Sequence, residues 1–190
     1  MKKLLIIALA LATITGAYAQ QTSKEAKKAA KQAEKEARRA AQNAEKMVEY
    51  NQAKGALEAR DFVLEANQLV FKRGQTSYVN PNTNFIALKG GRASIQIAPN
   101  NAVAGANGRG GVTVEGNASS IKYNVDSKGN LTFSMMVIGR GVSAKVELSI
   151  PYGSAVCSAD VIPNFNNQTM SFNGTLLPTS ESNVFKGLSW

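Results

Sequence analysis

Residues 142–150 read Val-Ser-Ala-Lys-Val-Glu-Leu-Ser-Ile, with an apolar residue at every second position and a polar residue at each position between. A period of two predicts a β-strand with one buried face and one face in water. Strands of this kind are typical of antiparallel sheets. The stretch therefore predicts a β domain, and its flanks should hold further strands separated by turns.

Such strands and turns are found on both sides of the stretch. Gly90-Gly91 is a two-residue signal for a primed hairpin turn, and other joints are rich in Asp, Asn, Gly and Pro. Because most joints are short, successive strands should be antiparallel neighbours in a meander. The predicted strands are Phe62 to Phe71, Phe85 to Lys89, Ala93 to Ile97, Val112 to Val125, Leu131 to Ile138, Val142 to Ile150, Ala155 to Ile162 and Gln168 to Gly174.

The sequence leaves two architectures open for this mainly β domain. So many strands form either a β-sandwich or a flattened β-barrel, because a long open sheet would expose its edges and an apolar face. A barrel of about eight strands can also hold a small apolar ligand, as lipocalins do. The side chains that would line such an interior, or else simply pack as a core, are Phe133, Met135, Val137, Val146 and Leu148.

The N-terminus has the layout of a secretory signal peptide. Lys2-Lys3 precede an apolar run from Leu4 to Ile14, and Ala17-Tyr18-Ala19 stand just before Gln20. We therefore predict a signal peptide over residues 1–19, cleavage after Ala19 and a location in the periplasm or cell envelope. No second apolar run is long enough to span a bilayer, so no integral membrane span is expected in the mature chain.

Residues 20–60 form a leader of a different composition, ahead of the β domain at residues 61–190. It is rich in Ala, Lys, Glu, Gln and Arg, which are strong helix formers, so it predicts an α-helix. The helix would serve as a spacer or arm that holds the β domain away from, or against, a charged surface, and a solvated, partly ordered leader is the alternative. Small residues at a helix seam bury little area, so a monomer or weak dimer is expected. The spacing of a coiled-coil seam is present at Ala26, Ala30, Ala33, Ala37, Ala40, Ala44 and Met47.

The chain is basic in both parts. Residues 20–61 hold ten Lys or Arg against seven Asp or Glu, and residues 62–190 hold ten against six. In an exported protein this balance favours an anionic envelope component, or another envelope protein, as partner, and it does not favour nucleic acid. The alternative is that the charge serves solubility alone.

Composition excludes several classes of chemistry. Histidine is absent and Cys157 is the single cysteine, which rules out a His-based triad, a Cys/His metal site and an intramolecular disulfide. Cys157 shares a strand face with Ala155, Ala159 and Val161 and is predicted to be a small core residue. The alternative is a free thiol that pairs between chains.

No catalytic residue, cofactor or metal is predicted. A hydrolase of the glycosidase type would need two carboxylates in one cleft. The β domain has six carboxylates, and the sequence alone does not bring any two of them together. They are Glu65, Glu115, Asp126, Glu147, Asp160 and Glu181.

The glycine-rich loop at residues 105–111 is the one candidate contact for an anion or glycan, through Asn107 and Arg109. A phosphate-binding loop would lead into a helix, whereas a strand is predicted here, so an ordinary hairpin loop is the alternative.

Three stretches carry a resemblance to a known family. They are residues 84–97, 105–116 and 178–187. Together they resemble the domain-of-unknown-function family 4251 of Bacteroidetes, over about residues 59–187. The resemblance implies an exported protein of a Gram-negative, gut-type bacterium and brings no activity or catalytic residue. The function we predict is a non-enzymatic binding or scaffolding module of the envelope, with a lipocalin-like carrier as alternative and a hydrolase as a weaker one.

Overall fold

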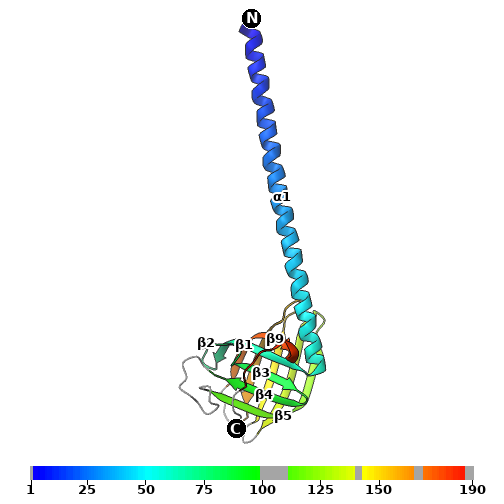
Figure 1. Ribbon diagram of the computed structural model, residues 1–190, viewed down its shortest axis with the longest axis vertical. Helices are drawn as coiled ribbons and strands as arrows, with labels where there is room; N and C mark the ends of the chain where they lie inside the picture. The colour runs from blue at the N-terminus through cyan, green and yellow to red at the C-terminus, as the bar shows by residue number, and fades with distance from the viewer. Residues whose placement is uncertain (1, 99–110, 140–142, 165–168, 187–190) are drawn as a thin grey trace. The chain divides into compact units, whose positions relative to one another are not determined.

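The computed structural model describes residues 2–98, 111–139, 143–164 and 169–186, with side chains from Ala26 onward. The chain divides into two compact units, Met1–Glu45 and Lys46–Trp190, which are described separately. Helix α1 (Lys2–Ala59) makes up the described part of the first unit, and its last turns belong to the second (Figure 1). Among the described residues, no helix has an apolar stretch long enough to cross a membrane.

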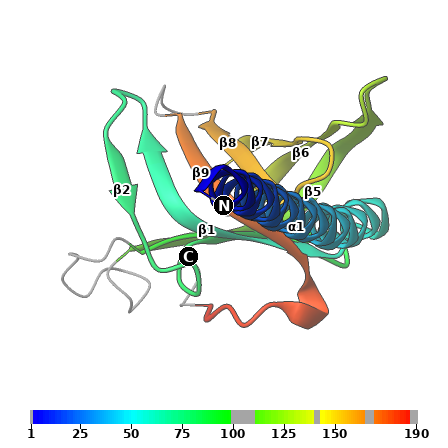
Figure 2. The same ribbon diagram turned by 90° about the horizontal axis from the view of Figure 1, so that it is seen from above.

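The second unit is an antiparallel β-barrel. Consecutive strands from β3 to β9 pair with one another, and β1 pairs with both β3 and β9, so that eight of the described strands close into a barrel (Figure 2). The strands are β1 (Phe62–Phe71), β2 (Thr76–Tyr78), β3 (Phe85–Lys89), β4 (Arg92–Ile97), β5 (Val112–Val125), β6 (Leu131–Gly139), β7 (Ser143–Ile150), β8 (Val156–Pro163) and β9 (Met170–Pro178), followed by the 3-10 turn η1 (Thr179–Glu181).

The predicted antiparallel meander is confirmed, and of the two architectures left open the chain adopts the barrel. The Gly90-Gly91 hairpin forms as predicted, with φ of 57° and 79°, the positive values that a primed turn requires. Strand β2 was not predicted. It is an extra strand that pairs with the second half of β1, and its three residues are too few to show a period.

The barrel interior is apolar because strand residues alternate in burial. In β7, Ala144, Val146, Leu148 and Ile150 are buried, and the residues between them are exposed or half-buried. Phe133 meets Phe62 edge to face, with ring centroids 5.2 Å apart. The five side chains proposed as an interior lining, Phe133, Met135, Val137, Val146 and Leu148, all belong to this one core cluster.

The last turns of α1 complete the core. Tyr50, Ala53, Ala56 and Leu57 recur on one helix face and are buried in the same cluster as the barrel interior. The helix ends with Arg60 in the left-handed region at φ 56°, where Asp61 N–H donates to the Ala56 carbonyl. This is the pattern of a Schellman cap, and it turns the chain from helix directly into β1.

The segment after β9 contacts residues of β1, β4 and β5. Ser182 Oγ donates to Glu65 Oε1 at 2.7 Å, and Gln96 Nε2 donates to the Phe185 carbonyl at 2.8 Å. Lys186 forms an ion pair with Glu115, whose side chain is only 16% exposed. The side chain of Glu115 is therefore largely withdrawn from solvent beside the C-terminal segment.

Candidate functional site

The outer face of β5 to β8 carries an open groove of about 430 Å³. Most of the residues that line this outer groove carry polar side chains that point away from the core. The residues that line it are Lys122, Asn124, Thr132, Phe133, Ser134, Glu147, Leu148, Ser149, Ser158 and Asp160.

Strand register places the polar lining in two rows that cross the strands. In an antiparallel sheet, directly paired residues point to the same face, so each row runs from β5 to β8. The amide-hydroxyl row is Asn124, Thr132, Ser149 and Ser158, and the charged row is Lys122, Ser134, Glu147 and Asp160.

A β-bulge in β5 lies next to the hollow. The register of β5 against β6 shifts between Ser119 and Lys122, where Ser120 adopts φ of 51°. Bulges bend a strand and increase its twist. The bulge comes just before Lys122 and Asn124, the two residues that β5 contributes to the groove.

The groove contains a pair of carboxylates that the sequence did not reveal. Glu147 on β7 lies directly opposite Asp160 on β8. Lys145 Nζ lies 2.8 Å from Glu147 Oε1, and Ser171 Oγ donates a hydrogen bond to Asp160 Oδ1. Like charges in directly opposed positions destabilise a sheet, so the local partners relieve only part of an unfavourable arrangement.

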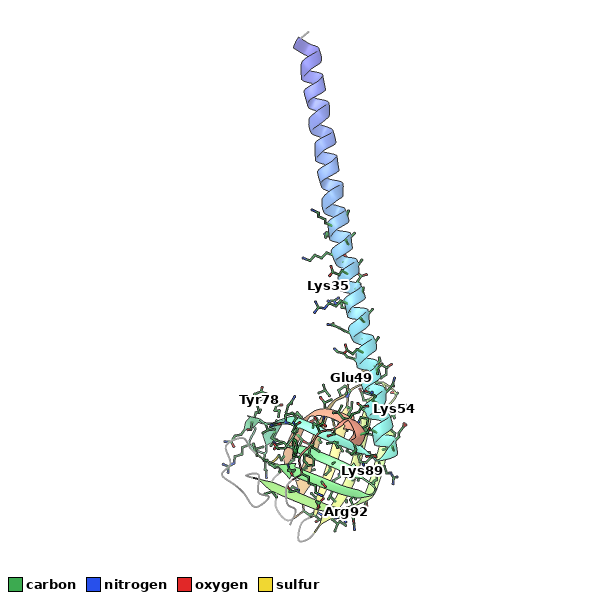
Figure 3. All side chains as sticks on the ribbon, viewed as in Figure 1. Lys35, Glu49, Lys54, Tyr78, Lys89 and Arg92 are labelled. Atoms are coloured by element: carbon green, nitrogen blue, oxygen red, sulfur yellow. The ribbon has the colours of Figure 1, made fainter. Side chains whose placement is uncertain are left out.

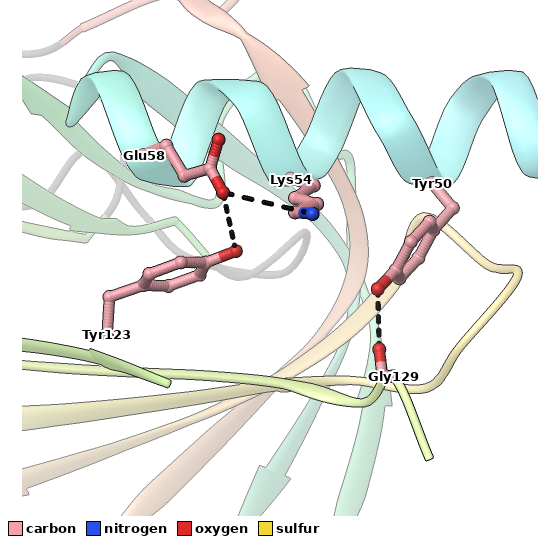
Figure 4. A network of polar contacts seen from close by, with 5 residues as sticks. All are labelled: Tyr50, Lys54, Glu58, Tyr123 and Gly129. Carbon is pink, nitrogen blue, oxygen red and sulfur yellow. Dashed lines mark hydrogen bonds and ion pairs between the residues drawn. The ribbon is translucent and has the colours of Figure 1, made fainter. Parts of the chain in front are cut away.

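A second polar network joins α1 to the barrel (Figure 4). Tyr50 O–H donates to the Gly129 carbonyl at 2.5 Å, and Tyr123 O–H donates to Glu58 Oε1 at 3.2 Å. Burial, together with the negative charge of Glu58 and its hydrogen bond, raises the pKa of Tyr123 to about 12. Burial likewise raises the pKa of Tyr50. The network positions the last turns of the helix on the barrel.

The turn between β5 and β6 is organised by Asp126. Its Oδ1 accepts from the N–H groups of Lys128 and Asn130 at 2.8 and 2.9 Å, and its Oδ2 accepts from Asn130 Nδ2. These hydrogen bonds, led by those from Asn130, hold the pKa of Asp126 below its usual value. The turn thereby presents the Gly129 carbonyl to Tyr50 in a fixed orientation.

The tyrosine network predicts a specific alkaline response. The pKa of Tyr123 is higher in the folded state than in the unfolded state. Its contribution to the free energy of unfolding is therefore complete below pH 10 and is lost as pH rises through about 12. The wild-type free energy of unfolding should therefore fall between these values. Tyr123→Phe should flatten that decline in urea titrations, with Tyr78→Phe as the control on an exposed tyrosine. An identical alkaline slope in wild type and Tyr123→Phe would contradict the assignment.

Cys157 is a core residue, as predicted. The thiol is free and fully buried, and burial raises its pKa to about 12. It therefore stays protonated at neutral pH and is no nucleophile. A thiol with no exposed surface also cannot pair with a second chain while the barrel is folded.

The described side chains of the first unit form a basic surface. From Ala26 to Glu45 every residue is exposed, with six Lys or Arg against three Glu. Lys28, Lys31, Lys35 and Arg39 recur at spacings of three and four and so share one helix face, together with Gln32 and Glu36. The alanines of the predicted seam lie on the opposite face, and the coiled coil stays a prediction.

The predicted anion or glycan contacts are not among the residues named for the groove or the basic helix. Asn107 and Arg109 belong to the connection between β4 and β5 and lie outside the described residues. Within the described ranges, no group of three or more Asp, Glu or Cys side chains is placed to hold a metal ion.

Comparison with known proteins agrees with this architecture. The sequence profile described as "Domain of unknown function (DUF4251)" matches residues 44–176. The chain is also similar to a DUF4251 family protein from Bacteroides eggerthii DSM 20697, known from a crystal structure at 1.95 Å. The two are 45% identical with a TM-score of 0.66, over 78% of this chain and 99% of that one. No curated protein matches the chain. Because the profile spans more than half of the sequence, from the end of α1 into β9, the chain belongs to the DUF4251 family.

Proposed function

We propose that this chain is an exported, non-enzymatic binding protein of the periplasm or cell envelope, held at an anionic envelope component by the basic face of α1. The observation that carries the proposal is the exposed surface of Lys28, Lys31, Lys35 and Arg39. Figure 3 shows Lys35 projecting away from the helix. The signal-peptide layout ahead of this surface supports export.

Electrostatic attraction is the dominant force that this surface offers. A Lys or Arg near an anionic membrane surface contributes about 1 kcal/mol, and the effect falls off within a Debye length. The opposite face bears alanine, which buries too little area to insert into a bilayer as Leu or Phe would. Binding should therefore be superficial, reversible and sensitive to salt.

The proposal predicts a charge-dependent loss of binding. In co-sedimentation with phosphatidylglycerol vesicles at low salt, replacing Lys28, Lys31, Lys35 and Arg39 together by Gln should weaken binding by about a hundredfold or more, from the loss of four favourable charges. The matched control replaces four exposed basic residues of the barrel, Lys72, Lys89, Arg92 and Lys128. Equal losses in both variants, or wild-type binding unaffected by about 0.5 M salt, would contradict the proposal.

A lipocalin-like carrier is a second candidate. The observation that favours it is the closed eight-stranded meander with an apolar interior and helix residues in its core. The five interior side chains named above would then contact the ligand. Native mass spectrometry of the purified protein distinguishes the two candidates, because a carrier would retain a small apolar mass and the envelope-binding protein would not.

A further inference from the structure

We infer that the outer groove of β5 to β8 is a binding site for an extended, neutral oligosaccharide. The inference rests on the barrel wall alone and does not depend on the basic helix. It follows from the shape of the groove, the free hydrogen-bonding groups within it, its charge, and the repeat of its two rows.

Several polar groups in the groove have no protein partner. In the described part of the chain, the side chains of Asn124, Ser134 and Ser149 make no hydrogen bond. Thr132 Oγ1 reaches only the Asn124 carbonyl, at 3.4 Å. Hydroxyl and amide groups both donate and accept, so they suit a ligand that itself carries many hydroxyl groups.

The carboxylate pair supplies the complementary acceptors. Ionised carboxylates can only accept hydrogen bonds. Glu147 Oε1 and Asp160 Oδ1 already have protein partners, which leaves Glu147 Oε2 and Asp160 Oδ2 for a ligand. Adjacent hydroxyl groups of a sugar present two donors, one for each of these two oxygens. The two opposed carboxylates repel each other and destabilise the ligand-free sheet. A ligand that donates hydrogen bonds to both residues would reduce that repulsion.

Charge argues for a neutral ligand. The lining holds Lys122 against Glu147 and Asp160, with Lys145 already paired to Glu147. A surface with this balance does not attract a polyanion, which separates the outer groove from the basic face of α1. Most of the lining residues carry polar side chains, whose hydrogen-bonding groups an apolar ligand would leave unpaired.

The repeat of the rows argues for an extended chain of sugars. Neighbouring members of a row sit on adjacent strands, which lie about 4.8 Å apart. A β-1,4-linked glycan is extended and advances by a similar length per sugar, so one sugar can meet one strand. An α-1,4-linked chain of the same glucose units coils and cannot keep that alignment across β5 to β8.

The test is a titration followed by backbone amide NMR of the full chain. The probes are β-1,4-linked glucose oligomers of two, four and six units, the α-1,4-linked hexamer and tetralysine. We expect the β-linked hexamer to shift amide resonances of the outer groove. Affinity should rise about tenfold from dimer to tetramer, because successive sugars reach further strands. It should rise little from tetramer to hexamer, because four strands line the groove.

Two variants make the test specific. Glu147→Gln combined with Asp160→Asn should weaken binding of the β-linked hexamer about tenfold or more, while the melting temperature stays the same or rises as the like-charge repulsion is removed. Glu181 is a carboxylate outside the groove, so Glu181→Gln should change neither the affinity for the β-linked hexamer nor the melting temperature. The inference is overturned if no oligosaccharide shifts groove resonances, if the α-linked hexamer binds equally well, if the double variant binds like wild type, or if tetralysine alone binds.

Discussion

Gly174→Ala is expected to prevent proper closure of the barrel. Gly174 on β9 pairs with Ala66 on β1, next to the register shift between Ala66 and Gln68. An added Cβ would stand 1.9 Å from the Glu65 carbonyl oxygen and 2.7 Å from the Ala66 Cα. These are backbone atoms, which cannot turn aside as a side chain does. Overpacking of this severity should lower the free energy of unfolding by about 3 kcal/mol or more.

The matched control is Gly55→Ala. Gly55 lies in α1 with nothing within 4 Å of an added Cβ, so alanine should raise the stability by about 0.5–1 kcal/mol through its helix propensity. Urea unfolding followed by far-UV circular dichroism measures both variants. If Gly174→Ala unfolded at the same urea concentration as wild type, the close approach of β1 and β9 at this point would be wrong.

Phe133→Ala is expected to destabilise the barrel by about 3–5 kcal/mol, the usual loss for a buried phenylalanine in a packed core. Phe133 is 2% exposed and contacts Phe62 edge to face. Thr132→Ala, on the same strand but facing outward, should cost no more than about 1 kcal/mol. The measurement is again the free energy of unfolding from urea titration.

The same variant also bears on the carrier candidate. If the interior held space for a ligand, Phe133 would have fewer packing partners and its loss would approach the transfer free energy alone, about 1.5–3 kcal/mol. Addition of a small apolar ligand should then raise the melting temperature of wild type. A loss at the upper end of the packed-core range, with no ligand effect, would support a filled interior.

Much of the fold could be predicted because burial has a simple period. The alternation in residues 142–150 predicted both the strand and its buried face, and β7 buries those same positions from Ala144 onward. Gly90-Gly91 predicted a hairpin because a primed turn requires positive φ at both residues, which glycine adopts more readily than any other residue. The interior positions Phe133, Met135 and Val146 followed from the same period and are all in the core.

The candidate site could not be predicted because it depends on register. The alternation in residues 142–150 placed Glu147 on the solvent face of its strand. Which residue of β8 faces Glu147 depends on the length and shape of the turn that begins at Pro151. A shift of two residues would keep both faces and separate Glu147 from Asp160. The bulge at Ser120 has no sequence signal at all, since a non-glycine residue with positive φ is uncommon. Closure by β1 and β9 is likewise a long-range pairing that no local pattern encodes.

That closure has a consequence for the timing of folding. β1, the first strand of the barrel, pairs with β9, the last, along its whole length. The backbone groups on that edge of β1 therefore stay unpaired until β9 is in place. Contacts so distant in the sequence form slowly, since the chain loses the entropy of a very large loop to make them. A nascent chain that lacks β9 should therefore remain open and pliable until synthesis is nearly complete. For an exported protein, which we propose this chain to be, late closure would keep the barrel unfolded while the polypeptide passes through a narrow translocation channel.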